Sequence, residues 1–166
     1  MKKVLSVAVI LFFCLQSFAQ QYAADSIPVY KQFPDIPAFS IFKVPDSTTF
    51  TKDSLKKKVP LVLIMFSPDC EHCQKETDSL LANIGLFKKA QIVMASPLDY
   101  FHIVEFYEKY KIAEYPNITI GKDPVWFLGQ YYKVRNFPTI VVYDKEGKFV
   151  KIFEGSVSVR KIAAQL

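Results

Sequence analysis

The sequence predicts an α/β domain with one mixed sheet and helices on both of its faces. Two apolar runs, residues 61–66 and 90–95, are each followed by a helical segment, which is typical of parallel strands joined by helical crossovers. Residues 138–143 and 148–153 flank the turn-forming segment 144–147, which predicts an antiparallel hairpin. The expected core order is therefore β-α-β-α-β-β-α, with right-handed crossovers and a last helix.

Ahead of this core, the sequence predicts a hairpin extension of the sheet. Residues 39–44 partly alternate between apolar and polar side chains, which favours an edge strand, and residues 48–51 are its expected partner. A helical turn over residues 53–55 then leads into the lysine run 56–58.

One helix is expected after each of these two apolar strands. The first spans residues 70–83. The second spans residues 99–110, where Ile103 and Phe106 recur at helical spacing and Asp99 can cap the N-terminus.

A helical insertion is predicted before the third core strand. Residues 119–125 contain a glycine and a proline and are expected to be a loop, and residues 126–132 a short helix. After the hairpin, Gly155 ends the last strand, and Ser156 or Ser158 can cap a final helix.

Residues 1–20 have the three parts of a secretory signal peptide: basic residues near the start, an apolar run over residues 4–15, and small residues up to Ala19. The run is too short for a comfortable membrane span. A lipid anchor on Cys14 is disfavoured because the bulky residues 11–13 precede it. We therefore expect cleavage near Ala19 and export, with the periplasm as the compartment, rather than a lipid anchor or a membrane tether.

After the leader, residues 21–36 are proline-rich and are predicted to form an extended arm, and residues 37–166 to form one folded domain. Apolar residues make up 51% of the chain, which favours a packed core over disorder. The formal charge of +5 falls to +3 without the two lysines of the leader, and residues 56–58 are the only basic run. A solvated helix end explains this run better than a nucleic-acid patch, so no nucleic-acid partner is expected. Membrane contact is expected only if the leader is retained.

The thiols Cys70 and Cys73 carry the chemistry that the sequence predicts. They are two of the three cysteines, and Cys14 lies in the leader, so the exported protein would hold this one pair. At a helix start, unpaired N–H groups and the helix dipole favour the thiolate of the first cysteine. We therefore expect Cys70 to be the nucleophile and Cys73 to be the thiol that resolves the mixed disulfide.

The chain resembles the thioredoxin fold, and within it the TlpA/ResA-like family of exported thiol-disulfide oxidoreductases. Three features carry the resemblance. The first is residues 70–76, which follow an apolar strand and end in Glu76, and the second is residues 136–139, which precede another apolar strand. The third is residues 36–40, followed by residues 50–51 and Leu55, near the start of the domain. The resemblance implies the thioredoxin-like mixed sheet, with the hairpin extension and the helical insertion described above, over about residues 36 to 166.

The resemblance also implies roles for particular residues. Pro138 is expected to be cis and, with Phe137, to bind the extended chain of the substrate. Glu76 is either a proton-transfer group or a solvated acid. The family pattern is broken at Asp69, where a tryptophan is usual, and at Ile64, where thioredoxins carry a buried aspartate. The usual proton-transfer scheme is therefore in doubt.

Three charged residues next to the thiols are predicted to tune their potential. His72 can donate a hydrogen bond or positive charge to the thiolate of Cys70, which would make the disulfide more oxidising. Asp69 and Glu71 act in the opposite direction, because nearby negative charge disfavours a thiolate. We expect an intermediate reduction potential as the net result.

The predicted function is reversible disulfide exchange between the Cys70–Cys73 pair and disulfide-containing exported proteins, with an unidentified thiol as electron donor or acceptor. Two alternatives stay open at this stage: a binding module for a soft metal such as Cu(I) or Zn²⁺, and an accessory domain with a structural disulfide. Structural zinc needs four ligands and the pair supplies two, so no metal and no other cofactor are expected.

Overall fold

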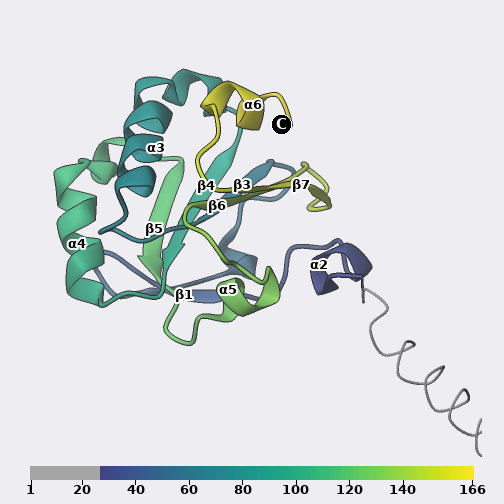
Figure 1. The fold of residues 1–166 in the computed structure, drawn as a ribbon, viewed down its shortest axis with the longest axis horizontal. Coiled ribbons are helices and arrows are strands. Elements are labelled where there is room, and N and C mark those ends of the chain that lie inside the picture. The colour runs from purple at the N-terminus through teal and green to yellow at the C-terminus, as the bar shows by residue number, and fades with distance from the viewer. Residues whose placement is uncertain (1–26) are drawn as a thin grey trace, which may run out of the picture.

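The computed structural model describes residues 27–166, and these residues form a seven-stranded mixed sheet with the order β2-β1-β5-β4-β3-β6-β7 (Figure 1). The strands are β1 (Ser40–Lys43), β2 (Thr49–Thr51), β3 (Leu61–Met65), β4 (Gln91–Ser96), β5 (Ile118–Lys122), β6 (Thr139–Tyr143) and β7 (Phe149–Glu154). β3 pairs parallel with β4 and antiparallel with β6, so the predicted mixed α/β sheet is confirmed. The predicted signal peptide, Cys14 and the first part of the arm lie outside the described residues.

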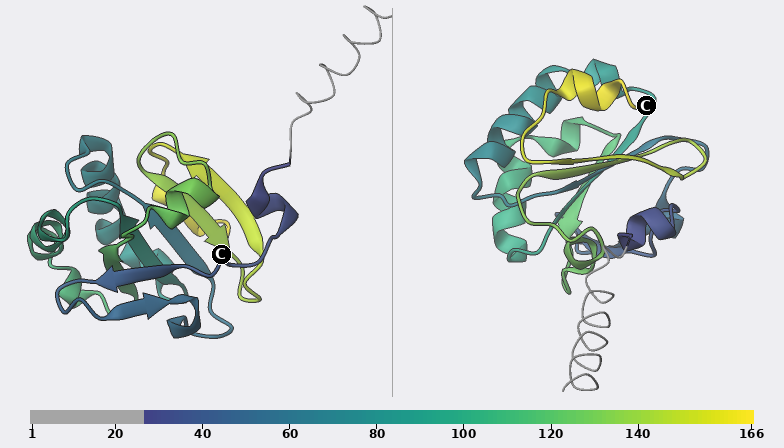
Figure 2. Two further views of the ribbon diagram at one scale, coloured as in Figure 1. Left: turned by 90° about the horizontal axis from the view of Figure 1, so that it is seen from below. Right: turned by 45° about the vertical axis from the view of Figure 1, so that its right-hand side comes forward.

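Helices cover both faces of this sheet (Figures 1 and 2). The α-helices are α2 (Val29–Gln32), α3 (Glu71–Ala82), α4 (Tyr100–Lys109), α5 (Phe127–Tyr131) and α6 (Val159–Ala163). Short 3₁₀ turns span Lys52–Ser54, Ile84–Phe87 and Ile112–Glu114.

The central strand β3 is buried along its whole length and divides the core into two clusters. Val62 and Ile64 pack on the side of α3, α4 and α6. Leu61, Leu63 and Met65 pack on the other side, with residues of α2 and α5. This two-sided burial explains why the sequence of β3 is continuously apolar rather than alternating.

The predicted loop over residues 119–125 is wrong, because residues 118–122 form β5. This strand lies between β4, to which it is parallel, and β1, to which it is antiparallel. The prediction took Gly121 as a sign of a loop, but the sheet requires a glycine at this position. A Cβ atom there would lie 2.4 Å from the carbonyl oxygen of Phe42. Pro124 lies beyond the end of the strand.

Replacing Gly121 by alanine should therefore destabilise the protein. We expect the free energy of unfolding in urea to fall by about 1–3 kcal/mol, because the backbone of β1 must move away. Gly85→Ala is the matched control: the nearest atom to its added Cβ is a flexible lysine carbon at 3.9 Å. Equal unfolding free energies for the two variants would contradict the close contact between β1 and β5.

Three smaller features also differ from prediction. The arm is not wholly extended: it forms the helical turn α2, because Tyr30 is buried against the rings of Tyr132 and Phe149, with centroids at 5.7 and 5.2 Å. The side chain of Asp99 does not cap α4 and instead accepts a hydrogen bond from Lys122 at 3.3 Å. The alternation of polar and apolar residues over 148–153 predicts a half-buried strand, but an irregularity in the pairing of β6 with β7 leaves Val150 exposed.

Candidate active site

The two cysteines lie where β3 passes into α3. Cys70 is the N-cap residue of α3, and its backbone N–H donates to the carbonyl oxygen of Ser67 at 3.1 Å. The side chain of Gln74 donates to the carbonyl oxygen of Pro68 at 2.8 Å, which ties the first turn of the helix to the preceding loop. These local bonds fix the loop that presents Cys70.

The two thiols, which are not joined by a disulfide, have different environments. Cys70 is partly exposed, and its Sγ atom lies 3.8 Å from the carbonyl oxygen of Phe137. Cys73 is only 1% exposed. The pKa of the Cys73 thiol is raised to about 12, chiefly by burial; a backbone hydrogen bond from Ser67 opposes the rise, and the neighbouring Cys70 and Glu76 add to it. A substrate can thus approach Cys70, whereas Cys73 is shielded.

Pro138 faces this pair from the start of β6. The Phe137–Pro138 peptide bond is cis, as the resemblance implied, and a second cis bond joins Val44 and Pro45. Thr139 pairs with Met65, the last residue of β3, so the proline sits beside the end of the strand that leads to Cys70. The ring of Phe137 packs edge-on against Trp126, with centroids 5.6 Å apart.

Glu76 is a buried acid, not a solvated one: 7% of its surface is exposed. One carboxylate oxygen accepts a hydrogen bond from the backbone N–H of Val157 at 3.0 Å. The other has no partner within the described part of the chain. Burial raises the pKa of the Glu76 carboxyl, and the N–H of Val157 partly opposes this.

Glu76, Cys73 and Pro138 line one small cavity of about 10 Å³, which has room for about one water molecule. Ile64, at the position of the missing aspartate, lines the same cavity. Glu76 therefore supplies a buried carboxylate next to Cys73 from α3, whereas the position of the missing aspartate, Ile64, is on β3.

The three predicted tuning residues are all exposed at the rim. Glu71 forms an ion pair with Lys75, which lowers the pKa of the Glu71 carboxyl and partly neutralises its charge. The side chain of His72 makes no hydrogen bond among residues 27–166, and only its backbone oxygen is engaged, by Ser156 at 3.5 Å.

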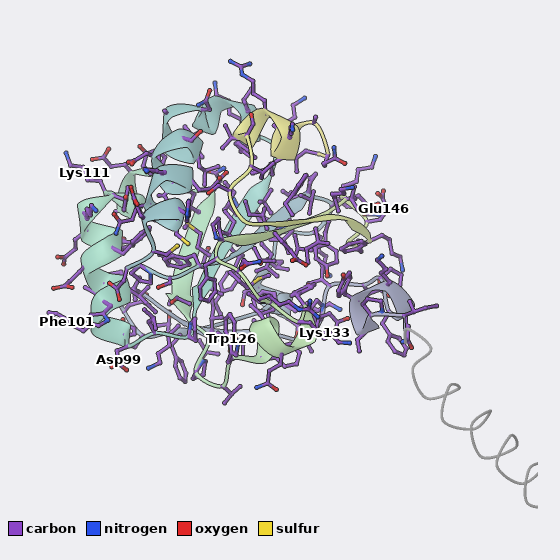
Figure 3. The ribbon with its side chains drawn as sticks, in the orientation of Figure 1. Asp99, Phe101, Lys111, Trp126, Lys133 and Glu146 are labelled. Carbon is purple, nitrogen blue, oxygen red and sulfur yellow. The ribbon has the colours of Figure 1, made fainter. Side chains whose placement is uncertain are left out.

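His102 also lies at this site, although it is far from the two cysteines in the sequence. Its Nδ1 atom lies 4.0 Å from a carboxylate oxygen of Asp69, the residue before Cys70. His102 is in the first turn of α4, near Phe101 and Asp99, which Figure 3 labels. β3 and β4 are parallel neighbours, so the segments that follow them meet at one edge of the sheet; this topology was the available signal.

One other sequence feature, the triplet Asn117–Thr119, does not belong to this site. The amide of Asn117, in a glycosylation-like triplet, donates to the carbonyl oxygens of Phe87 and Ala90 at 3.1 and 3.3 Å. Within residues 27–166, no three His, Cys, Asp or Glu side chains gather in a group that could hold a metal ion.

Comparison with known proteins is consistent with this geometry. Residues 49–166 match the family described as a thioredoxin-like domain. No curated protein matches significantly.

Solved structures share the fold at low sequence identity. A secreted disulfide oxidoreductase of Mycobacterium tuberculosis, homologous to DsbE of E. coli, is 21% identical with a TM-score of 0.64, over 77% of this chain and 93% of its own. M. tuberculosis DsbF is 22% identical with a TM-score of 0.65, over 84% and 96%. The exposed lipoprotein thioredoxin Etrx1 of Streptococcus pneumoniae is 24% identical with a TM-score of 0.57, over 78% and 100%.

Proposed function

The chain belongs to the thioredoxin-like domain family, and we propose that it is an exported thiol-disulfide oxidoreductase that acts through Cys70 and Cys73. The observation that carries this proposal is the pairing of a partly exposed Cys70 at a helix start with a buried Cys73, opposite the cis-proline Pro138. A dithiol of this kind is suited to two successive exchange reactions.

In the first reaction, the thiolate of Cys70 attacks one sulfur of a substrate disulfide. A mixed disulfide forms, and the other substrate sulfur leaves as a thiolate, which takes up a proton. In the second, the sulfur of Cys73 attacks Sγ of Cys70, which releases the reduced substrate and leaves a Cys70–Cys73 disulfide. The substrate gains two electrons and the enzyme loses two, so turnover requires an external thiol donor.

Glu76 is suited to the second reaction. Cys73 must lose its proton to attack, and at pH 7 a thiol of pKa about 12 is ionised in only about one molecule in 10⁵. The carboxylate that lines the same cavity can accept this proton, directly or through one water molecule. Its raised pKa brings its basicity closer to that of the thiol.

The backbone beside Pro138 is suited to holding the substrate chain. The N–H of Phe137 makes no hydrogen bond within the described residues, and its carbonyl oxygen faces the Sγ atom of Cys70. An extended substrate segment can therefore pair with Phe137 while its disulfide lies at Cys70.

Export and the substrate class follow from the predicted leader. Residues 1–20 support a location outside the cytoplasm, where exported proteins carry disulfides that this site can exchange. Within residues 27–166, no helix is long and apolar enough to cross a membrane.

An equilibrium titration against glutathione or dithiothreitol tests this function. We expect one two-electron transition with a potential between about −270 mV, as in thioredoxin, and about −120 mV, as in the oxidant DsbA. A potential at or below that of thioredoxin would contradict a dominant effect of His72. Stoichiometric zinc or copper in the reduced protein would instead favour the metal-binding alternative.

Asp69 and His102, which lie next to each other at the rim of the site, should adjust the reactivity of Cys70. Asp69→Asn is expected to raise the rate of Cys70 alkylation by iodoacetamide about two- to fivefold at low salt, because a nearby negative charge disfavours the thiolate. His102→Gln should lower the rate, because it removes the imidazole whose Nδ1 atom lies 4.0 Å from the Asp69 carboxylate and leaves that negative charge without this partner. Both effects should shrink in 1 M salt, and salt-independent effects would point to a structural cause.

A further inference from the structure

A basic groove of about 520 Å³ lies at the opposite end of the sheet from Cys70. It is bordered by Val59 and Gln91, next to the starts of β3 and β4, and by the turn between β6 and β7. Its charged lining consists of five lysines and three acids: Lys52, Lys56, Lys57, Lys58, Lys145, Asp35, Asp53 and Glu146.

Two of the three acids already have cationic partners. Asp35 accepts a hydrogen bond from Lys148 at 2.8 Å, and Glu146 lies 3.9 Å from the amine of Lys145. Lys52 and the lysine run 56–58 form no salt bridge with any described residue. The groove therefore has an excess of positive charge that is available to an external anion.

Exposed apolar side chains adjoin this groove. Ile27, Val29 and Phe33 are 60%, 42% and 64% exposed. The segment is tied to the domain at Phe33, whose carbonyl oxygen accepts a hydrogen bond from the hydroxyl of Tyr131 at 3.2 Å. Asp35, two residues later, lines the groove, and Figures 1 and 3 show α2 beside the turn that holds Glu146. The segment that carries these apolar side chains therefore lies next to the groove.

We propose that this face, defined by residues 27–33 and the lysines of the groove, docks on the surface of an anionic phospholipid bilayer. Lysines attract anionic headgroups, and adjacent apolar side chains enter the boundary of the acyl chains. The folded domain itself then contacts the membrane, whether or not the leader is retained.

Docking in this way leaves the thiol pair accessible. Cys70 follows the carboxyl end of β3, whereas the groove lies at the amino end of the same strand. A domain that rests on its lysine face therefore presents Cys70 to the surrounding solution. This inference does not depend on the redox activity, and loss of the lysines should leave insulin reduction in solution unchanged.

Co-sedimentation of the protein with vesicles tests the proposal. We expect binding to vesicles of equal parts phosphatidylcholine and phosphatidylglycerol, weak binding to phosphatidylcholine alone, and release in 1 M salt, where the Debye length is about 3 Å. Each lysine near such a surface contributes a factor of about five to binding. Replacing Lys56, Lys57 and Lys58 together by glutamine should weaken binding at least about tenfold.

Matched variants on other faces are the controls. Replacing the exposed Lys109, Lys111 and Lys161 by glutamine removes the same charge but should leave binding within about twofold. Phe33→Ser should weaken binding, whereas Phe101→Ser, which removes a ring that is 67% exposed on α4, should not. Equal binding to both vesicle types, or equal binding by the two triple-lysine variants, would overturn the proposal.

Discussion

Cys70→Ser is expected to reduce insulin reduction by dithiothreitol to the uncatalysed rate, a loss of at least about 100-fold. A serine hydroxyl cannot form the mixed disulfide that begins the reaction. Cys73, the other cysteine among the described residues, cannot replace it, because it is buried and its pKa is raised to about 12. The measurement is the rate of insulin precipitation with equal concentrations of wild type and variant.

This loss should not arise from misfolding. Cys70 is the N-cap residue of α3, a position that favours serine, and it is only partly buried. The variant should therefore have the wild-type circular dichroism spectrum and urea midpoint. A folded variant that kept more than about a tenth of the wild-type rate would show that Cys70 is not the nucleophile.

Glu76→Gln is expected to slow the second reaction, in which Cys73 displaces the substrate, by about 100-fold. Without the carboxylate, no base in the cavity accepts the proton of Cys73. The rate can be followed as the decay of a preformed mixed disulfide between Cys70 and a thionitrobenzoate group. In the wild type this rate should rise with pH as the Glu76 carboxyl ionises, and in the variant that rise should be absent.

Asp78→Asn is the matched control, because it changes an exposed acid on the same helix. It should leave the decay rate unchanged. Equal decay rates for Glu76→Gln and wild type would exclude Glu76 as the proton acceptor, even if the two proteins differ in folding stability.

The same carboxyl also makes stability depend on pH. The folded protein binds the proton of Glu76 more tightly than the unfolded chain, whose carboxyl has the usual pKa of 4.5. This contribution to the free energy of unfolding is therefore complete below pH 4.5 and is lost as the pH rises through the raised pKa of the folded state. Glu76→Gln should remove this decline in urea titrations across the range.

Much of the fold could be predicted from local patterns. The apolar run of β3 and the helical spacing of α4 are patterns of residues close together in the sequence. The type of each element and its approximate ends could therefore be predicted. β5 could not, because its glycine resembles a loop signal. The reason for that glycine is the close approach of Phe42 on β1, nearly 80 residues earlier in the chain.

In the candidate site, too, the features that depend on local sequence could be predicted and those that depend on long-range contacts could not. The spacing and helix-start position of Cys70 and Cys73 are local, and so they could be predicted. The burial of Glu76 could not, because it depends on the backbone of Val157 in the segment before α6. The approach of His102 to Asp69 likewise arises from the pairing of two strands and not from sequence proximity.

The central claim is that Cys70 attacks the substrate and Cys73 resolves the intermediate. Mass spectrometry of a Cys73→Ala variant, mixed with a protein that has one accessible disulfide, tests it most directly. We predict that a one-to-one mixed disulfide accumulates on Cys70 and is released by dithiothreitol, whereas a Cys70→Ala variant accumulates none. An adduct that forms equally well on Cys73 in the Cys70→Ala variant, or on neither cysteine, would contradict the assignment of the two thiols.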